Sequence, residues 1–200
     1  MATSPNWVSV SMQLGWSKPG LVDAGIPLQA ATSNLAAGAV TPSVPIGTIA
    51  MFRDIGTSQL GTGAFMYLPG VTSTVAGDVV EVRTPNGSGL VQGDPNNGAA
   101  TIRWTGTANT GAVLAVATAA SNIQTTWGWY QVQGSAIVNV SGTVTAGQAP
   151  YFGQVATWET NAAVGGKQVL GARSVSASGV PDTGKAVFTL NNPVVQSQIT

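Results

Sequence analysis

Few side chains in this chain could carry out chemistry. Its 200 residues include no histidine and no cysteine. This excludes histidine triads, histidine proton shuttles, thiol nucleophiles, disulfides and most zinc sites. An enzyme would have to work with five Asp, two Glu, three Lys and three Tyr. The composition therefore already argues against catalysis.

The closest pair of carboxylates is Asp78 and Glu81. The surrounding pattern predicts a strand, and strand residues three apart point to opposite faces of the sheet. Two such groups cannot flank one glycosidic bond as the acid and base of a glycosidase do. We expect both to be solvated strand charges, and we predict no catalytic residues.

Two loops bear a partial likeness to ligand-binding loops. Asp94-Pro-Asn-Asn-Gly resembles a calcium loop, but the alternation of oxygen ligands is broken and the distal glutamate is missing. The glycine-rich segment 56–63 lacks the Lys-Ser/Thr pair and the helical pattern that follow a phosphate-binding loop. We interpret the two as a turn and a surface loop, and we predict neither a metal nor a cofactor.

The most distinctive tetrapeptide is Trp127-Gly-Trp-Tyr. A cluster of aromatic rings could stack on a sugar, as in a carbohydrate-binding adhesin. In a strand, however, Trp127 and Trp129 share one face while Tyr130 and Val132 share the other. Both faces would then be apolar, which is typical of a strand buried between layers. Core packing is the favoured interpretation.

The charge content is unusually low. Lys+Arg 7 and Asp+Glu 7 give a formal net charge of +0, and charged residues make up 7% of the chain, against about 25% in ordinary globular proteins. A lone monomer with so few charges has little to keep it in solution. We therefore expect neighbouring subunits to occupy much of the surface.

The same composition bears on partners and location. The cations are scattered singly, without the basic stripe that binds phosphates, so we expect no nucleic acid partner. No apolar run reaches the ~18 residues of a spanning helix, and the first residues lack a signal-peptide pattern. We expect the protein to be made in a cytoplasm and not to associate with a membrane.

The fold class follows from the spacing of short apolar runs. Gly 26 and Pro 11 interrupt any helical period, and from residue 46 onward β-type runs recur about every 8–12 residues. We predict an all-β fold, an antiparallel β-sandwich or barrel, over residues 46–200. The expected strands are Ile46–Arg53, Ala64–Leu68, Asp78–Arg83, Ala100–Trp104, Ala112–Thr118, Trp127–Gln133, Ala136–Val140, Ala149–Gly153, Val169–Arg173 and Lys185–Leu190.

Residues 1–45 differ from the rest of the chain. Five prolines recur there among Gly, Ala, Thr and Ser, and proline removes ladder donors. We predict an extended N-terminal arm. Because it carries Trp7 and Trp16, and disordered segments are usually poor in aromatics, we expect the arm to dock on a partner through these two residues.

Several segments follow one another in a distinctive order. Gly63-Ala-Phe-Met-Tyr-Leu-Pro-Gly-Val-Thr-Ser-Thr-Val-Ala-Gly-Asp-Val-Val comes first, and Trp127-Gly-Trp-Tyr-Gln-Val-Gln-Gly then leads into Gly142-Thr-Val-Thr-Ala-Gly-Gln-Ala-Pro-Tyr-Phe. Val169-Leu-Gly-Ala-Arg follows and precedes Ala186-Val-Phe-Thr-Leu. In order and spacing, these segments resemble those of small virion proteins of tailed bacteriophages. The resemblance covers roughly residues 46–190 and leaves the arm outside it.

The resemblance implies a β-rich structural subunit without catalytic residues. Such proteins decorate or cement the outside of the capsid, made in the bacterial host cytoplasm and bound to the major capsid protein and to copies of themselves. We expect this chain to stabilise the head in that way. Two alternatives stay open: a tail or head–tail connector component, and a carbohydrate-binding adhesin that uses Trp127 and Trp129.

Overall fold

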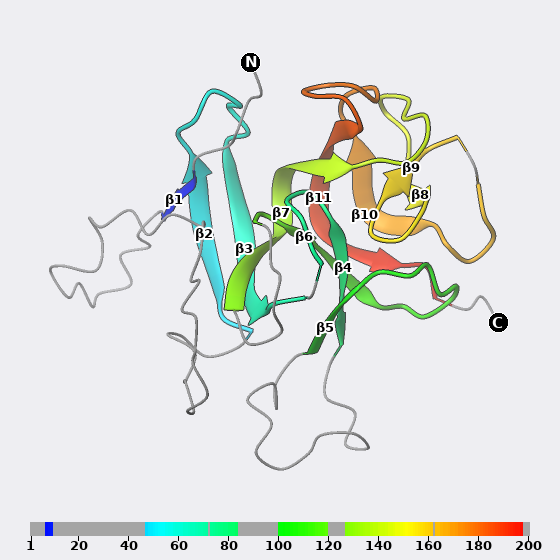
Figure 1. Cartoon of the computed structure of the whole chain (residues 1–200), viewed down its shortest axis with the longest axis horizontal. Helices are drawn as coiled ribbons and strands as arrows, with labels where there is room; N and C mark the ends of the chain where they lie inside the picture. Colours follow the sequence, from blue (N-terminus) through cyan, green and yellow to red (C-terminus); the bar gives the residue numbers. More distant parts are fainter. Residues whose placement is uncertain are drawn as a thin grey trace, which may run out of the picture.

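The computed structural model describes residues 7–9, 47–71, 73–83, 100–119, 127–161 and 163–197, and these residues form strands and turns without a helix (Figure 1). The predicted all-β class is thereby confirmed. The strands are β1 (Trp7–Ser9), β2 (Ile49–Asp54), β3 (Thr62–Pro69), β4 (Val79–Arg83), β5 (Ala100–Arg103), β6 (Val113–Ala117), β7 (Trp127–Asn139), β8 (Tyr151–Phe152), β9 (Trp158–Glu159), β10 (Val169–Ser174) and β11 (Lys185–Val195).

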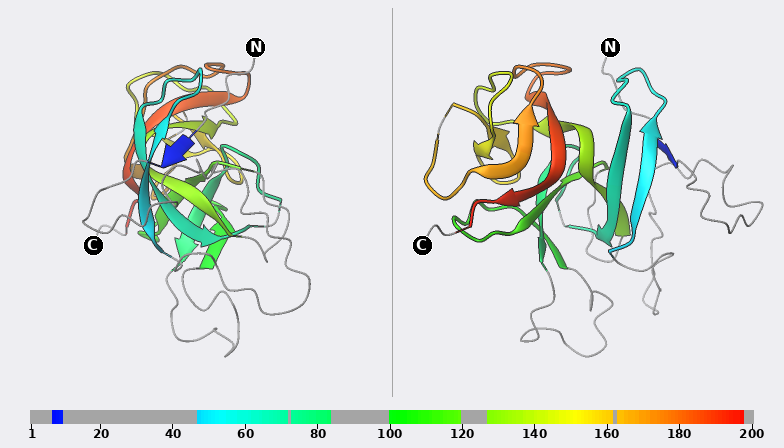
Figure 2. Two further views of the ribbon diagram at one scale, coloured as in Figure 1. Left: turned by 90° about the vertical axis from the view of Figure 1, so that its left-hand side faces the viewer. Right: turned by 180° about the vertical axis from the view of Figure 1, so that it is seen from behind.

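One antiparallel sheet contains nine of these strands. Its order is β1-β2-β3-β7-β11-β6-β4-β5, with β10 on the other side of β11. Strand β7 also pairs with β6, so that β7, β11 and β6 each pair with the other two. This closed circuit of pairings curls the sheet into a half-barrel, and the two-stranded β8–β9 sheet lies inside the curl beside β10 and β11 (Figures 1 and 2).

Strand β7 is bent and joins the two parts of the sheet. The sequence predicted two strands here, separated at Gly134, but the structure has one strand of 13 residues. Its first half pairs with β3 and its second half with β11. The pairing with β3 shifts register at Val132, and Gly134 follows with φ +90°. Gly134 therefore bends a continuous strand and does not end it. Bulges and glycines within strands commonly produce such bends.

The buried Gln131 stabilises this bend. Its side-chain Nε2 donates to the carbonyl oxygens of Gln133 at 3.1 Å and of Ser135 at 2.9 Å. A register shift interrupts the ladder and leaves carbonyl groups in need of donors. The amide of Gln131 supplies donors to two carbonyls of the bent segment.

Strands β4 and β6 separate two hydrophobic clusters. Val79 of β4 and Leu114 of β6 face the larger cluster, while Val80 and Ala115 face the smaller one that Tyr130 also lines. Both strands are thus buried on both faces. This explains why the expected strand Ala112–Thr118 is apolar almost throughout.

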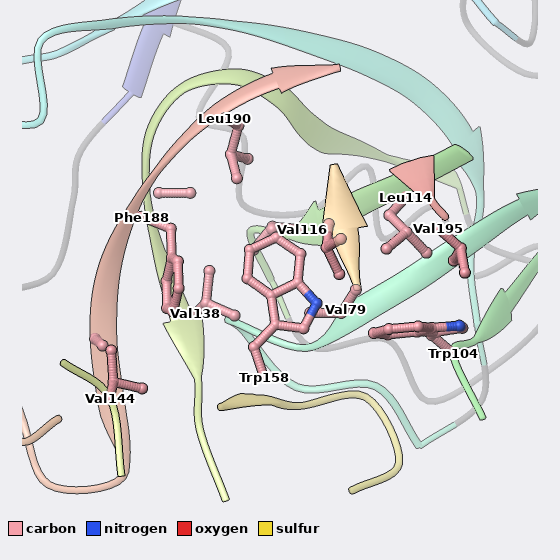
Figure 3. Packing of buried hydrophobic residues seen from close by; sticks show 13 residues of the cluster. Val79, Trp104, Leu114, Val116, Val138, Val144, Trp158, Phe188, Leu190 and Val195 are labelled. Atoms are coloured by element: carbon pink, nitrogen blue, oxygen red, sulfur yellow. The ribbon is translucent and has the colours of Figure 1, made fainter. Parts of the chain in front are cut away.

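The larger cluster fills the space inside the curl (Figure 3). Trp158 of β9 packs edge to face on Phe188 of β11, with ring centroids 5.0 Å apart, and Trp104 packs similarly on Phe152 of β8 at 5.1 Å. Both tryptophans are fully buried. The small β8–β9 sheet therefore covers the concave side of the half-barrel with aromatic side chains.

The last strand is longer than the sequence predicted. Ala186, Phe188 and Leu190 face inward and are buried, as expected from their alternation. The predicted strand stopped at Leu190, yet β11 continues through Pro193 to Val195. The proline is tolerated because the pairing with β10 shifts register there, and proline is compatible with bulges.

Candidate functional site

The first strand covers the outer edge of the sheet. β1 pairs antiparallel with β2, so that Trp7 lies opposite Asp54 and Ser9 opposite Phe52 (Figure 2). The three residues of β1, Trp7–Ser9, are the described part of the predicted arm. Trp16, the other predicted contact residue, lies outside the described residues, as do 1–6 and 10–46.

Trp7 is buried among aromatic rings of its own chain. Its side chain is 4% exposed and packs edge to face on Phe65, with ring centroids 4.8 Å apart. Phe65 in turn packs on Phe52 at 5.2 Å. The sequence singled out Trp7 but missed these two phenylalanines as its receiving site. Their positions in β2 and β3 on one face of a sheet were the only signal that could have found them.

The rings continue from this site into a row. Phe52 packs on Trp129 at 5.1 Å, and Trp129 packs on Tyr67 at 5.1 Å. We call these five residues, Trp7, Phe65, Phe52, Trp129 and Tyr67, the aromatic row. It links β1, β2, β3 and β7, so the edge strand is joined to the centre of the sheet.

This packing bears on the Trp127-Gly-Trp-Tyr segment. Trp129 is half-buried between Phe52 and Tyr67, while Tyr130 and Val132 on the other face are buried. The predicted division of the strand into two apolar faces is confirmed at these positions. The side chain of Trp127 lies outside the described part of the structure.

Asp54 fixes the end of β2 next to Trp7. It is buried, and its two carboxylate oxygens accept hydrogen bonds from the backbone N–H groups of Gly56 at 2.8 Å and Leu60 at 3.0 Å. The hydrogen bonds to Asp54 hold the glycine-rich segment as a loop after β2. This agrees with the prediction of a loop. Nothing in these contacts resembles a phosphate-binding loop.

The interpretation of Asp78 and Glu81 as solvated charges is wrong. Their exposed fractions are 2% and 6%. Asp78 forms a salt bridge with Nη2 of Arg103 at 3.1 Å and accepts hydrogen bonds from Asn139 Nδ2 at 2.9 Å and the Val75 N–H at 3.2 Å. Buried charges are normally paired in this way. The sequence did not show that β4 is covered by strands on both sides.

These contacts give Asp78 a structural role. It connects the turn before β4 to β5 through Arg103 and to β7 through Asn139. The described partners of Asp78 are all donors. The arrangement holds three segments together.

The pKa of Tyr130 departs clearly from its ordinary value. Burial raises the pKa of its phenol well above the ordinary value, and a hydrogen bond with the backbone of Val71 offsets part of the rise. The ring lies in the smaller hydrophobic cluster. A phenol held neutral in this way serves as a packing residue.

No group of three or more Asp or Glu side chains in the described ranges could hold a metal ion. The segment Asp94–Gly98, compared above with a calcium loop, falls in the part of the chain that the structure does not describe. Within the described residues, no helix is long and apolar enough to cross a membrane.

The described surface carries many exposed aliphatic side chains. In the described residues they are Ile49, Ile55, Val75, Val113, Val155, Val164, Leu170, Val175 and Val180. Leu170 lies in β10, and Val175 and Val180 lie between β10 and β11. Ile49 is the first residue of β2, and Ile55 follows its last residue. Single exposed aliphatics are ordinary, but here they occur on a chain with only 7% charged residues.

Comparison with protein-family models, with curated proteins and with solved structures finds no match to this chain.

Proposed function

We propose that this chain is a virion structural protein of a tailed bacteriophage, a decoration subunit that binds the outside of the capsid. It would bridge neighbouring major capsid subunits and stabilise the head against the pressure of packaged DNA. Many weak contacts repeated by the symmetry of the shell would supply that stability. The proposed role is mechanical and involves no catalysis, cofactor or metal.

The observation that carries the proposal is the surface. Nine large aliphatic side chains are exposed over the described residues, and the chain has seven cationic and seven anionic residues in total. The cores of protein interfaces are depleted of charge in the same way. A surface of this kind is suited to contact with other subunits.

The sequence resemblance supports the assignment to a virion. The segments that resemble small phage virion proteins fall on β3 and β4, on β7 and the chain after it up to β8, on β10 and on β11. They therefore span the half-barrel and leave out the arm. The buried tryptophans and the paired carboxylate Asp78 are consistent with a structural subunit.

A binding experiment tests the proposal. Heads that lack this protein and separated tails are each incubated with the purified chain and then sedimented. We expect saturable binding to the heads and none to the tails. Binding to tails alone would support the connector alternative, and binding to neither would contradict a virion role.

A further inference from the structure

The outer edge of β2 needs a covering strand. An unpaired edge strand offers its N–H and C=O groups to any other chain. Among the described strands, β1 alone pairs with this edge of β2. The strand β1 has three residues, and its described side chain, Trp7, is buried. The cover is therefore a short strand that the ring of Trp7 anchors.

The site that receives the Trp7 ring is formed by β2 and β3 and does not depend on β1. The ring centroids of Phe52 in β2 and Phe65 in β3 lie 5.2 Å apart, and their edge-to-face contact does not involve β1. Asp54, opposite Trp7, is held by the loop N–H groups of Gly56 and Leu60. A Trp7 from any copy of the chain would meet the same rings and the same backbone edge.

The segment that connects β1 to β2 is long enough for the β1 on a given β2 to come from another copy of the chain. The roughly 40 residues between β1 and β2 (10–48) can span at most about 130 Å. A domain the size of residues 46–200 has a diameter of about 40 Å. The tether therefore allows β1 of one subunit to reach β2 of the subunit beside it.

We propose that, in assemblies of this protein, β1 of one copy pairs with β2 of a neighbouring copy, so that Trp7 fills the Phe52–Phe65 site of its neighbour. Exchange of an identical element makes the same contacts between subunits as within one. The formal net charge of +0 and the low content of charged residues leave little electrostatic repulsion between copies. The inference rests on the proposed function only in that a decorated shell holds copies side by side.

Disulfide trapping tests the exchange in the full chain. The protein has no cysteine, and Val8 and Arg53 are register partners in the β1–β2 pair. The double variant Val8→Cys/Arg53→Cys is oxidised in purified particles and in dilute free protein, then separated on a non-reducing denaturing gel. The matched control is Val8→Cys/Thr143→Cys, whose second position is exposed and outside the pair.

We expect the particles to show cross-linked dimers and a ladder of higher species that the control lacks, while dilute protein gives cross-linked monomer. Cross-linked monomer alone in the particles would overturn the exchange and leave the decoration role intact. No cross-link in either sample would overturn the β1–β2 pairing itself. If the chain is absent from particles, the proposed function fails, and the cross-link in concentrated free protein then decides the exchange: interchain species support it and monomer alone overturns it.

Discussion

Trp7 and Phe65 meet edge to face with ring centroids 4.8 Å apart, although one lies near the start of the chain and the other lies in the third strand. This contact joins β1 to the aromatic row. It makes the first described strand part of the sheet, whichever copy of the chain supplies it.

Removing the Trp7 ring should release β1. We expect Trp7→Ala to lower the free energy of unfolding by about 3 kcal/mol, because a buried aromatic side chain is replaced by a cavity. Trp7→Phe, the matched control, keeps an edge-to-face ring and should lose less. Urea unfolding followed by circular dichroism measures both. Equal stability of wild type and Trp7→Ala would show that the ring does not pack on Phe65.

The bend of β7 should depend on Gly134. A Cβ at this position would lie 2.6 Å from the carbonyl oxygen of Thr62 and 2.9 Å from Cα of Gly63, and φ is +90°. We expect Gly134→Ala to cost roughly 3 kcal/mol or more, through backbone strain and the clash together.

Gly147 provides the control for this change. It has φ +80°, but nothing lies within 4 Å of an added Cβ. Gly147→Ala should therefore cost only the left-handed conformation, about 1–2 kcal/mol. Thermal unfolding of the two variants separates clash from strain, and equal losses would refute the close approach of β7 to β3.

The fold could be predicted from local patterns where one strand face is apolar. Alternation identified β11 through Phe188, and the positions of most strands followed from apolar runs between glycines and prolines. The continuity of β7 could not be predicted, because Gly134 in a bent strand and a glycine in a turn look alike in sequence. The length of β11 beyond Pro193 depends on a register shift with β10, which is a property of the partner strand.

The salt bridge of Asp78 should contribute measurably to stability. We expect Asp78→Ala to lower the free energy of unfolding by about 3 kcal/mol, since it removes the ion-pair partner of Arg103 and one of the two acceptors of the Asn139 amide, which keeps only the carbonyl of Ala76. Asp182→Ala, which removes a carboxylate from a solvent-exposed turn hydrogen bond, should change stability by less than about 0.5 kcal/mol. Similar losses in both variants would contradict a specific role for Asp78.

Tyr130 should make the protein sensitive to alkali. Because burial raises the pKa of its phenol in the folded state, the unfolded chain loses this proton first, near pH 10. Stability from this group is therefore complete below pH 10 and falls above it by about 1.4 kcal/mol per pH unit.

Tyr130→Phe should remove this part of the alkaline decline while retaining the ring. Unfolding free energies measured at pH 8 to 11 for both proteins give the comparison. A decline of the same slope in Tyr130→Phe would show that another group is responsible.

The candidate site could be predicted only in part. Trp7 stands out in sequence as an aromatic residue in a proline-rich arm, but Phe52 and Phe65 are ordinary strand residues until β2 and β3 are paired. Likewise, Asp78 and Glu81 were predicted to be solvated because polar residues usually are. Arg103, which pairs with Asp78, lies in β5, whereas Asp78 directly precedes β4. Only the sheet order brings the two residues together.

The number of copies in each particle is the most direct test of the proposed role. Purified particles are separated on a denaturing gel, and the band of this chain is quantified against the band of the major capsid protein. A decoration subunit predicts a ratio near one or a simple fraction such as one third, because it occupies the shell lattice. A ratio of a few per cent would place the chain in the tail or connector, and its absence from particles would contradict the virion role altogether.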